Sequence, residues 1–263
     1  MDSKRKLIEV LRYEGSEIQV KTDVVIREIS LKIFVNGMLL SSLSAIDDKQ
    51  IELGLGFLLS EGIVESLKPV TRYTLCDKGL TLEIFCDAKE EDLEEYVADS
   101  EKVSGCGGGV SGKLEKLEPR SFSKFPIEFS TIPDLMYRFQ THSELFKETG
   151  GIHSAALCRG DEICYFAEDI GRHNAVDKVI GMAATDDQNI SDYYLVISGR
   201  ISSEIIKKAI RTRIPLIVSQ AAATSKAVSL ASEYGIYIVG FARGKRFNIY
   251  TGLNNLMGEV KND

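Results

Sequence analysis

The stretch Tyr194-Leu-Val-Ile-Ser-Gly-Arg-Ile-Ser-Ser-Glu-Ile-Ile-Lys-Lys-Ala-Ile-Arg-Thr-Arg-Ile-Pro-Leu-Ile-Val-Ser219 decides the fold class. Its two apolar runs, over 194–198 and 216–219, predict short buried strands. The residues over 202–213 repeat apolar side chains at helical spacing and predict a helix between them. A strand, a helix and a second strand in this order indicate a layered α/β domain with a largely parallel sheet.

The same alternation continues on both sides of this stretch. We expect further strands over 154–158, 163–167 and 236–239, and further helices over 174–184 and 224–234. One more helix is predicted upstream, with Thr131 as its cap, Pro133 in its first turn and Gly150-Gly151 at its end. Ligands of such sheets bind in the loops at the carboxyl ends of the strands, so these loops are the expected place for a site.

The first half of the chain has a different pattern. Strands over 17–36 end at Asn36-Gly37, a dipeptide that favours a hairpin turn. An amphipathic helix over 47–62, strands over 71–76 and 80–86, and a solvated acidic helix over 87–96 are expected to follow. The sequence therefore predicts two domains, an N-terminal α+β region over 1–125 and an α/β domain over 126–263, with the division near 125.

Composition and charge exclude several classes of protein. A net charge of −7 argues against broad nucleic-acid affinity. No apolar run reaches the roughly 18 residues of a membrane span, and the N-terminus has no signal-peptide core, so we expect a cytoplasmic protein. The five cysteines are odd in number and include no Cys-x-x-Cys pair, which argues against a disulfide framework and against a zinc site.

One cysteine, Cys106, lies in the glycine-rich stretch Ser104-Gly-Cys-Gly-Gly-Gly-Val-Ser-Gly112. Glycine lets the backbone adopt unusual conformations and lets other groups approach closely, so this stretch is interpreted as a loop that presents a thiol. A flexible joint between domains is the alternative. The glycines also match the dinucleotide fingerprint G-x-G-x-x-G, but an apolar strand does not precede them, and Pro119 leaves little room for a following helix.

Cationic residues gather in the loops that follow the expected strands. Arg200 comes just after one strand and close to a helix start, where backbone N–H groups and a guanidinium suit an anion. Arg243, Lys245 and Arg246 place three cations within four residues, and Gly244 among them allows close approach of a ligand. A phosphate site is favoured for this cluster, and a solvated turn is the alternative.

The three histidines, His142, His153 and His173, lie far apart and have no cysteine or carboxylate at metal-ligand spacing, so no protein-coordinated metal is expected. His153 and His173 lie in loops, where structural hydrogen bonding and ligand contact are both open. Asp169 and Arg172 are expected to form a local salt bridge, or else a polar rim around an active loop.

Several segments in a fixed order carry a resemblance to a known family: Leu55-Gly-Phe-Leu-Leu-Ser-Glu-Gly-Ile63, Ser104-Gly-Cys-Gly107, Gly151-Ile-His-Ser-Ala-Ala156, Glu168-Asp-Ile-Gly-Arg-His-Asn-Ala-Val-Asp-Lys178, Ser198-Gly-Arg200, and Val239-Gly-Phe241 through Tyr250-Thr251. With these segments the chain resembles the FdhD family of formate dehydrogenase accessory proteins, which are cytoplasmic sulfur carriers for the molybdenum cofactor. The resemblance extends over most of the chain.

The resemblance implies a function for Cys106. A cysteine at this position accepts sulfane sulfur from a cysteine desulfurase, holds it as a persulfide, and transfers it to the bis(molybdopterin guanine dinucleotide) cofactor of formate dehydrogenase. Many relatives have Cys-x-x-Cys in this loop, whereas here Cys106 is followed by Gly107-Gly108-Gly109. A mechanism with one cysteine is therefore expected, because a resolving thiol is optional for sulfur transfer.

The resemblance also implies a cofactor-binding segment, a fold and an oligomeric state. The segment comprises Phe241, Ala242, Arg243, Gly244, Lys245 and Arg246, and we add Arg172, His173 and Arg200 as further candidates for the same ligand. The larger domain is expected to be a three-layer αβα domain similar to the cytidine deaminase fold without its zinc ligands, and the protein is expected to be a homodimer. Two other functions stay open: a cofactor chaperone that moves no sulfur, and a nucleotide-dependent redox enzyme.

Overall fold

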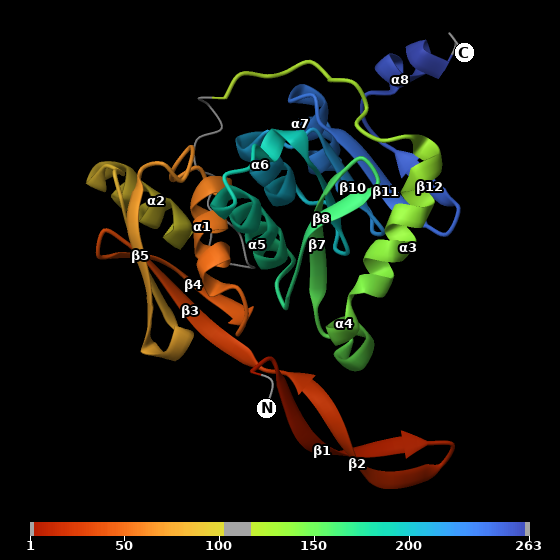
Figure 1. Cartoon of the computed structure of the whole chain (residues 1–263). Helices are drawn as coiled ribbons and strands as arrows, with labels where there is room; N and C mark the ends of the chain where they lie inside the picture. The colour runs from red at the N-terminus through yellow and green to blue at the C-terminus, as the bar shows by residue number, and fades with distance from the viewer. Residues whose placement is uncertain (1–2, 103–116, 261–263) are drawn as a thin grey trace.

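The protein contains three β-sheets, which Figure 1 shows in a computed structural model that describes residues 3–102 and 117–260. Strands β1 (Arg5–Glu14) and β2 (Glu17–Ile26) form a separate two-stranded arm. A four-stranded sheet has the order β4-β3-β6-β5, and a six-stranded sheet has the order β12-β11-β10-β9-β7-β8. The sequence analysis expected the strand β2 but not its partner β1.

The four-stranded sheet consists of β3 (Glu28–Val35), β4 (Met38–Ile46), β5 (Val70–Cys76) and β6 (Thr81–Cys86). The hairpin predicted at Asn36-Gly37 is confirmed, since Val35 pairs with Met38 and both turn residues have positive φ. Positive φ at both central positions is the geometry that asparagine followed by glycine favours. The central pair β3 and β6 is parallel, and the two outer pairs are antiparallel.

The six-stranded sheet consists of β7 (His153–Arg159), β8 (Glu162–Asp169), β9 (Tyr194–Ile197), β10 (Leu216–Ser219), β11 (Tyr237–Arg243) and β12 (Arg246–Ile249). Only β9, β10 and β11 are parallel neighbours, and the other pairs are antiparallel. The expectation of a largely parallel sheet is therefore wrong. The reason is that β7–β8 and β11–β12 are tight hairpins, with glycines of positive φ, Gly160 and Gly244, in their turns.

Helices cover both faces of this sheet, in agreement with an α/β class (Figure 1). On one face lie α5 (Arg172–Thr185), α6 (Ser203–Thr212) and α7 (Ser225–Glu233), and on the other lie α3 (Ile132–His142) and α8 (Leu253–Val260). Successive residues of a strand point to opposite faces of the sheet. In β9, Leu195 and Ile197 pack in one core cluster, whereas Tyr194 and Val196 pack in the other. The short elements are α4 (Glu144–Thr149), η1 (Asp77–Gly79), η3 (Phe129–Thr131) and η4 (Ile190–Asp192).

The single helix expected after Thr131 is two helices, α3 and α4. Ser143 between them is extended, with ψ of 102°, and its hydroxyl accepts the N–H of Phe146 to cap α4. Thr131 does not cap α3 through its side chain; its hydroxyl donates to the carbonyl of Glu128 at 2.7 Å. A serine cap in the middle of a helical pattern thus ends one helix and begins the next.

Helix α1 (Gln50–Ser60) joins the two larger sheets, and its expected amphipathic character is wrong because it is buried nearly all round. It crosses α5 at a distance that only glycine permits. A Cβ on Gly56 would lie 1.8 Å from the carbonyl oxygen of Asp177, and one on Gly181 would lie 1.9 Å from that of Glu52. The backbones of the two helices therefore touch, and one core cluster extends from the four-stranded sheet to the six-stranded sheet.

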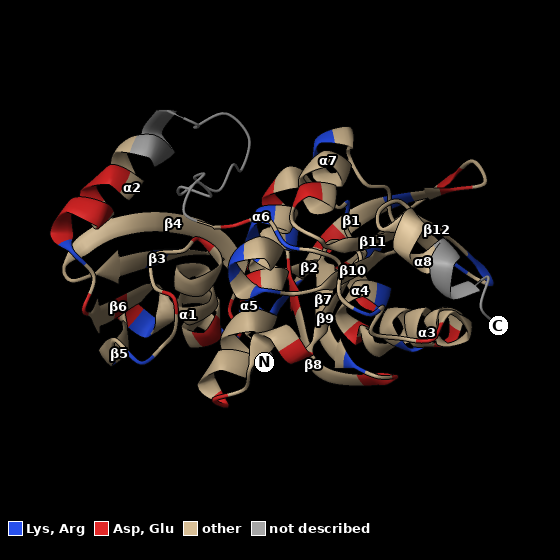
Figure 2. Cartoon of the chain, turned by 90° about the horizontal axis from the view of Figure 1, so that it is seen from above, with Lys and Arg blue, Asp and Glu red and all other residues tan. Residues whose placement is uncertain are grey.

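Helix α2 (Glu90–Lys102) lies at the periphery, and the red segments of its ribbon in Figure 2 mark the positions of Asp and Glu residues. Leu93 and Tyr96 turn inward and are buried, which leaves the carboxylates in solvent. The expected solvated acidic helix is thus present. Within the described part of the chain, none of the helices combines the length and the apolar character that crossing a membrane requires.

The segment before α3 packs on the six-stranded sheet. The Tyr237 hydroxyl donates to the carbonyl of Ser123 at 2.9 Å, and the rings of Phe122 and Phe125 lie 4.8 and 4.9 Å from the Tyr237 ring. A Cβ on Gly235 would lie 2.5 Å from the carbonyl oxygen of Arg120. The expected division near 125 therefore falls inside a segment that already contacts the larger sheet.

Candidate functional site

The candidate site lies at one edge of the six-stranded sheet. Strands β9, β10 and β11 are parallel, and β8 runs in the same direction because it is antiparallel to β7, which is antiparallel to β9. The carboxyl ends of these four strands therefore meet at the same edge, together with the start of β7. Helices α5, α6 and α7 begin at this edge, so their unpaired N–H groups make it favourable for anions.

A buried carboxylate holds the loop after β8 in place. Asp169 is fully buried and pairs with Lys178 at 2.7 Å, and it accepts hydrogen bonds from Gly171 N (3.1 Å) and Asn174 Nδ2 (2.9 Å). The backbone N–H of Ile46 donates to the same carboxylate at 3.3 Å. The salt bridge expected between Asp169 and Arg172 is therefore wrong, since Lys178 takes that position.

The held loop presents Arg172 and His173 at the start of α5. The Nε atom of Arg172 and the Nε2 atom of His173 are buried and have no hydrogen-bond partner among the described residues. Burial, and then the charge of nearby Arg200, lower the pKa of the Arg172 guanidinium. Burial, helped by Lys208 and Arg172, lowers the pKa of His173 to about 3, so this histidine is neutral at pH 7. Two unused polar atoms at a cationic helix start indicate a place for a ligand.

His153, at the start of β7, lies beside them. Its Nδ1 is 3.3 Å from the Ser198 hydroxyl, which accepts the N–H of Ser154 at 2.9 Å. A Cβ on Gly199 would lie 3.1 Å from Cδ of Arg172 and 3.4 Å from Nδ1 of His153, so glycine makes room for both side chains. Burial, and then Arg172, lower the pKa of His153. Arg200 follows in the same loop and is exposed.

The loop after β10 connects this part of the edge to the β11–β12 hairpin. The Ser219 hydroxyl donates to the carbonyl of Gly199 at 2.7 Å, and Gln220 Nε2 donates to that of Ser198 at 3.3 Å. On the other side, Arg243 Nε donates to the carbonyl of Gln220 at 2.8 Å, and the N–H of Phe241 donates to that of Ala221 at 3.0 Å. The loops after β9 and β10 and the end of β11 therefore form one connected edge.

The segment from Phe241 to Arg246 is a β-hairpin rather than the loop that the sequence suggested. Phe241 has φ of 51° at an irregularity in β11 and exposes 41% of its surface. Ala242 as a whole is buried in the core and offers a ligand almost no surface. Arg243 and Arg246 are paired across the strands, and Gly244 and Lys245 form the turn between them. All three cations are exposed.

The structure thus gathers at one edge nearly all of the residues that the sequence proposed for an anionic ligand. Cys106 lies outside the described residues. In residues 3–102 and 117–260, no three or more His, Cys, Asp or Glu side chains are grouped so as to hold a metal ion. The sequence analysis left ligand contact open for His153 and did not name Ser198 or Gln220 as candidates; the position of these residues directly before or after expected strands was the available signal.

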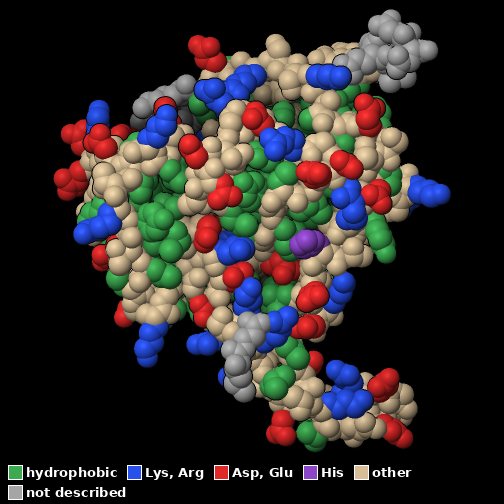
Figure 3. All heavy atoms as spheres, in the orientation of Figure 1, with side chains coloured by type: hydrophobic (Ala, Val, Ile, Leu, Met, Phe, Trp, Pro, Cys, Tyr) green, Lys and Arg blue, Asp and Glu red, His purple; other side chains and the backbone are tan. Residues whose placement is uncertain are grey.

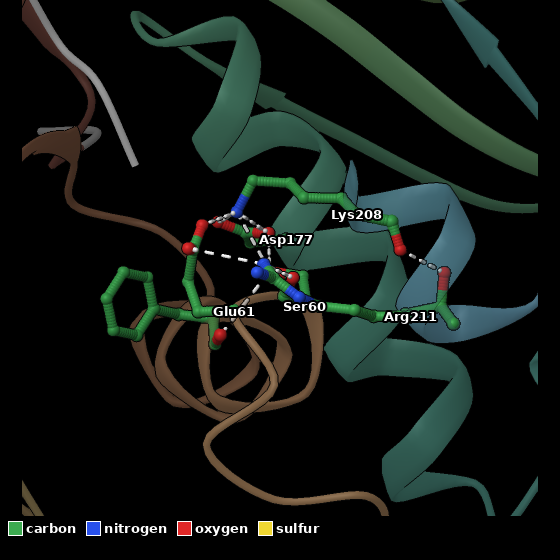
Figure 4. Close-up of polar contacts among 7 residues, drawn as sticks. Ser60, Glu61, Asp177, Lys208 and Arg211 are labelled. Carbon is green, nitrogen blue, oxygen red and sulfur yellow. Dashed lines mark hydrogen bonds and ion pairs between the residues drawn. The ribbon is translucent and has the colours of Figure 1, made fainter. Parts of the chain in front are cut away.

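A buried ion network anchors α5 at Asp177 (Figure 4). Lys208 Nζ lies 2.7 Å from Glu61 Oε1, 2.9 Å from Asp177 Oδ1 and 2.8 Å from the Ser60 hydroxyl. Arg211 donates to the Ser60 carbonyl at 2.9 Å. Burial raises the pKa of Asp177 to about 6, and Glu61 adds to the rise while Lys208 opposes it. The network ties α1, α5 and α6 together and so fixes the helix that carries Arg172 and His173.

Comparisons with known proteins agree with this architecture. A family model, the FdhD/NarQ family, matches residues 26–257. A sulfur carrier protein FdhD from Wolinella succinogenes is 38% identical over 231 residues, which cover 87% of this chain and 81% of the relative. A sulfur carrier protein FdhD from Bacillus licheniformis is 34% identical over 248 residues, which cover 92% of this chain and 93% of the relative.

A solved structure from Desulfotalea psychrophila, of a protein described as a formate dehydrogenase accessory protein, has the same fold. It superposes with a TM-score of 0.76 at 22% identity, over 94% of this chain and 97% of that one. The fold and the cationic edge of the six-stranded sheet together define the class of protein: a mixed α/β protein with a cation-lined site at the carboxyl ends of its strands. The chain belongs to the FdhD/NarQ family, as the match over most of its length shows.

Proposed function

We propose that this chain is a sulfur carrier required for formate dehydrogenase activity. Cys106 accepts sulfane sulfur from a cysteine desulfurase as a persulfide and transfers it to the molybdenum bis(molybdopterin guanine dinucleotide) cofactor. The observation that carries the proposal is the family membership: relatives named sulfur carrier protein FdhD align with 87% and 92% of the chain. In this proposal the protein is a sulfurtransferase, and the cofactor is its bound acceptor.

The chemistry of the site edge supports an acceptor that carries phosphates. Arg243 and Arg246 are paired across the hairpin, and like charges at paired positions repel each other unless an anion lies between them. The unpartnered Nε atom of Arg172 and the helix starts of α5 and α6 supply further donors. Phe241, exposed at the same hairpin, offers an apolar surface to a base or a pterin ring.

A single thiol is sufficient for the sulfur step. The Cys106 thiolate attacks the outer sulfur of the donor's persulfide, a new S–S bond forms on Cys106, and the donor's S–S bond breaks as its cysteine leaves as a thiolate. Sulfane sulfur changes carrier, and no external oxidant or reductant is consumed. Without a neighbouring thiol at Cys-x-x-Cys spacing, the Cys106 persulfide has no adjacent partner with which to close a disulfide.

The direct experiment is incubation with a cysteine desulfurase and cysteine, followed by intact mass measurement with and without reductant. The wild type is expected to gain the mass of one sulfur atom, and reductant is expected to remove it. Cys106→Ala should gain none. Cys76→Ala is the control, because Cys76 is an exposed cysteine in the described part of the chain. An unmodified wild type, or a modified Cys106→Ala, would overturn the sulfur-carrier proposal.

A cofactor-binding chaperone that moves no sulfur is the second candidate, and the cationic edge favours it equally, because cofactor binding alone explains that edge. Complementation of a strain that lacks its own sulfur carrier distinguishes the two. A chaperone predicts that Cys106→Ala restores formate dehydrogenase activity. A sulfur carrier predicts that it does not, although the variant protein still binds guanine nucleotide.

Four further features belong to the same proposal: a cytoplasmic location, two domains divided near 125, a relation of the six-stranded domain to the cytidine deaminase fold, and a homodimer. Partners are then a cysteine desulfurase, formate dehydrogenase and the guanine dinucleotide cofactor, without nucleic acid or membrane. The homodimer has a simple test, since light scattering during gel filtration should give twice the chain mass of 29.1 kDa.

A further inference from the structure

A cavity of about 530 Å³ lies at the edge of the six-stranded sheet that is opposite to the candidate site. Its lining includes Ser191, Pro215 and Ile236, which come shortly before β9, β10 and β11, so the cavity lies at the amino ends of these parallel strands. The segment 117–125, which contributes one wall, crosses the top of the molecule above α6 and α7 in Figure 1. We call this space the amino-end cavity.

One cation of the amino-end cavity, Arg120, is held in place through its backbone. Gly235 has φ of 63°, and a Cβ at this position would lie 2.5 Å from the carbonyl oxygen of Arg120. Three residues further along, the carbonyl of Ser123 accepts the Tyr237 hydroxyl at 2.9 Å. These contacts fix the segment against the sheet, while Arg120 itself is exposed and lines the cavity.

The second cation, Arg213, ends α6 in a conformation that glycine normally adopts. It has φ of 62° and ψ of 25°, and its N–H donates to the carbonyl of Ile210 at 3.2 Å. Glycine is preferred at this helix-end position because a Cβ is strained at positive φ. Arg213 therefore has a conformational cost that glycine would not have, which is typical of a residue whose side chain has a function. Arg213 also lines the amino-end cavity.

The two guanidinium groups act on each other and have no anion. Burial, and then the charge of Arg213, lower the pKa of Arg120. Neither guanidinium forms an ion pair or a hydrogen bond with a described residue, although Glu118 also lines the cavity. The free carbonyl groups at the end of α6 account for a cation at Arg213 but not for a second cation beside it. Two unpaired arginines in one cavity indicate a place for an oxyanion.

The surrounding surface supports this interpretation. Figure 3 shows Lys and Arg side chains along the upper rim of the molecule, where the segment 117–125 runs in Figure 1. The whole chain has a net charge of −7, so an anion can bind only where local cations outweigh this charge. Arg120 and Arg213 provide two such cations at one place.

The rest of the lining suits the organic part of a ligand. Ile210, Ile214 and Ile236 are buried there, and Tyr234 and Pro215 are partly exposed beside them. The volume of the cavity is within the range of about 300–1,000 Å³ that is usual for small-molecule sites. Two guanidinium groups match a phosphate better than a carboxylate, because a phosphate monoester carries about −1.5 to −2 charges at pH 7 and three acceptor oxygens.

We propose that the amino-end cavity binds a small molecule that carries a phosphate ester, with Arg120 and Arg213 on the phosphate and the apolar lining against the organic part. The inference goes beyond the proposed function, because neither sulfur acceptance nor binding of the guanine dinucleotide requires this site. Inorganic phosphate is the other source of the same anion. Since it has no organic part, it tests whether the apolar lining contributes to binding.

The test measures the binding of phenyl phosphate, methyl phosphate and inorganic phosphate by isothermal titration calorimetry at low salt. Phenyl phosphate should bind the wild type about tenfold more tightly than the other two, because its ring is removed from water by the apolar lining. Arg120→Gln should weaken this binding by at least about tenfold. Lys124→Gln is the matched control, since it removes the same charge from the same segment, whereas Lys124 lines a different cavity. It should bind phenyl phosphate as tightly as the wild type.

Arg213→Gly separates a ligand-binding role from a structural role. Glycine suits the positive φ at this position, so without ligand the variant should unfold at the same temperature as the wild type or at a higher one. It should nevertheless lose the binding of phenyl phosphate. Arg243→Glu with Arg246→Glu should keep that binding, because both residues lie at the opposite edge of the sheet.

A wild type that does not bind phenyl phosphate at millimolar concentration would overturn the inference, and so would unchanged binding in Arg120→Gln and Arg213→Gly. Equal affinities for phenyl phosphate and inorganic phosphate would contradict the role of the apolar lining. Binding that is lost only in the Arg243 and Arg246 variant would assign the phosphate to the opposite edge. Persulfide formation on Cys106 enters none of these outcomes, so this inference and the proposed function can fail separately.

Discussion

Arg243 and Arg246 lie directly opposite each other in the β11–β12 hairpin, so two guanidinium groups leave the same face of the sheet side by side. The hydrogen bond from Arg243 Nε to the carbonyl of Gln220, at 2.8 Å, holds one of them toward the neighbouring loop. Two unit charges about 4 Å apart interact by about 4 kcal/mol at an effective dielectric near 20, so an anion bound between the pair would convert repulsion into attraction.

From this relationship we predict that GDP, a fragment of the proposed cofactor, raises the melting temperature of the wild type. Saturation at about 100 times the dissociation constant corresponds to about 2.7 kcal/mol, which shifts the melting temperature of a chain of this size by several degrees. Arg243→Glu with Arg246→Glu should remove the shift, because the site then repels phosphate. The measurement is a thermal scan at low and at moderate salt.

The matched control is Lys32→Glu with Lys89→Glu, which changes the net charge equally at two exposed positions of the four-stranded layer. This control should keep the GDP shift. If the arginine double variant also kept it, the nucleotide site would have to lie further along the edge, at Arg172, His173 and Arg200.

The α/β half of the molecule could be predicted closely from sequence. Every strand and helix expected between 154 and 239 is present, because buried strands and amphipathic helices leave clear apolar periods. The apolar periods did not predict that β7 and β12 run antiparallel to their neighbours. Each of these strands is joined to the next or previous strand by a two-residue turn at a glycine, and such a turn leaves the apolar periods unchanged. Strand β1 was missed because its polar and apolar residues alternate without a buried face.

The candidate site was only partly predictable. Arg243 and Arg246 stand close together in sequence, so their clustering was visible, whereas the contact of His153 with Ser198 joins residues 45 positions apart. The salt bridge expected between Asp169 and Arg172 was wrong because sequence proximity favoured the nearest cation, whereas the fold places Lys178, further along α5, against Asp169. Lys208 was missed because a charged residue within an apolar helix face has no partner that sequence alone can identify.

The contact between α1 and α5 predicts a stability cost for added methyl groups. In Gly56→Ala or Gly181→Ala the new Cβ would meet backbone oxygens at 1.8 and 1.9 Å, and a backbone atom of a packed helix cannot move aside as a flexible side chain can. Each substitution should lower the free energy of unfolding by about 1–3 kcal/mol or more, measured by urea denaturation.

Gly151→Ala is the control for these two substitutions. Its Cβ would have no neighbour nearer than 3.7 Å, so the free energy of unfolding should change by less than about 0.5 kcal/mol. Equal stability of the Gly56, Gly181 and Gly151 variants would show that the two helices do not touch at the backbone.

The buried ion network predicts that replacing Lys208 lowers the free energy of unfolding more than replacing its neighbour Lys207. Lys208→Met would leave the Asp177 carboxylate buried without its cation and Glu61 with Arg211 alone, at 3.6 Å, which should cost about 3–5 kcal/mol of unfolding free energy. Lys207→Met, one position earlier and partly exposed, should cost less than about 1 kcal/mol. The comparison by urea denaturation at pH 7 uses the same substitution on the same helix. A loss of similar size in both variants would show that burial of the ion network does not determine the cost.

The last prediction concerns pH. Burial lowers the pKa of His173 to about 3 in the folded protein, whereas an unperturbed histidine has a pKa near 6.5. Between these values the unfolded chain binds a proton at this position and the folded protein does not, so the free energy of unfolding rises with pH over this window and levels off above 6.5. Lowering the pH from 7 to 5 should therefore cost the wild type about 2 kcal/mol through His173 alone.

His173→Gln replaces this group with one that does not titrate. The other histidines and the carboxylates contribute in both proteins, so the informative quantity is the difference between the two stability curves. The variant should lose about 2 kcal/mol less than the wild type between pH 7 and pH 5, measured by urea denaturation at closely spaced pH values. Parallel curves would mean that His173 keeps access to solvent or to a carboxylate, and it would then not be the neutral, unpartnered donor that the edge of the sheet offers to a ligand.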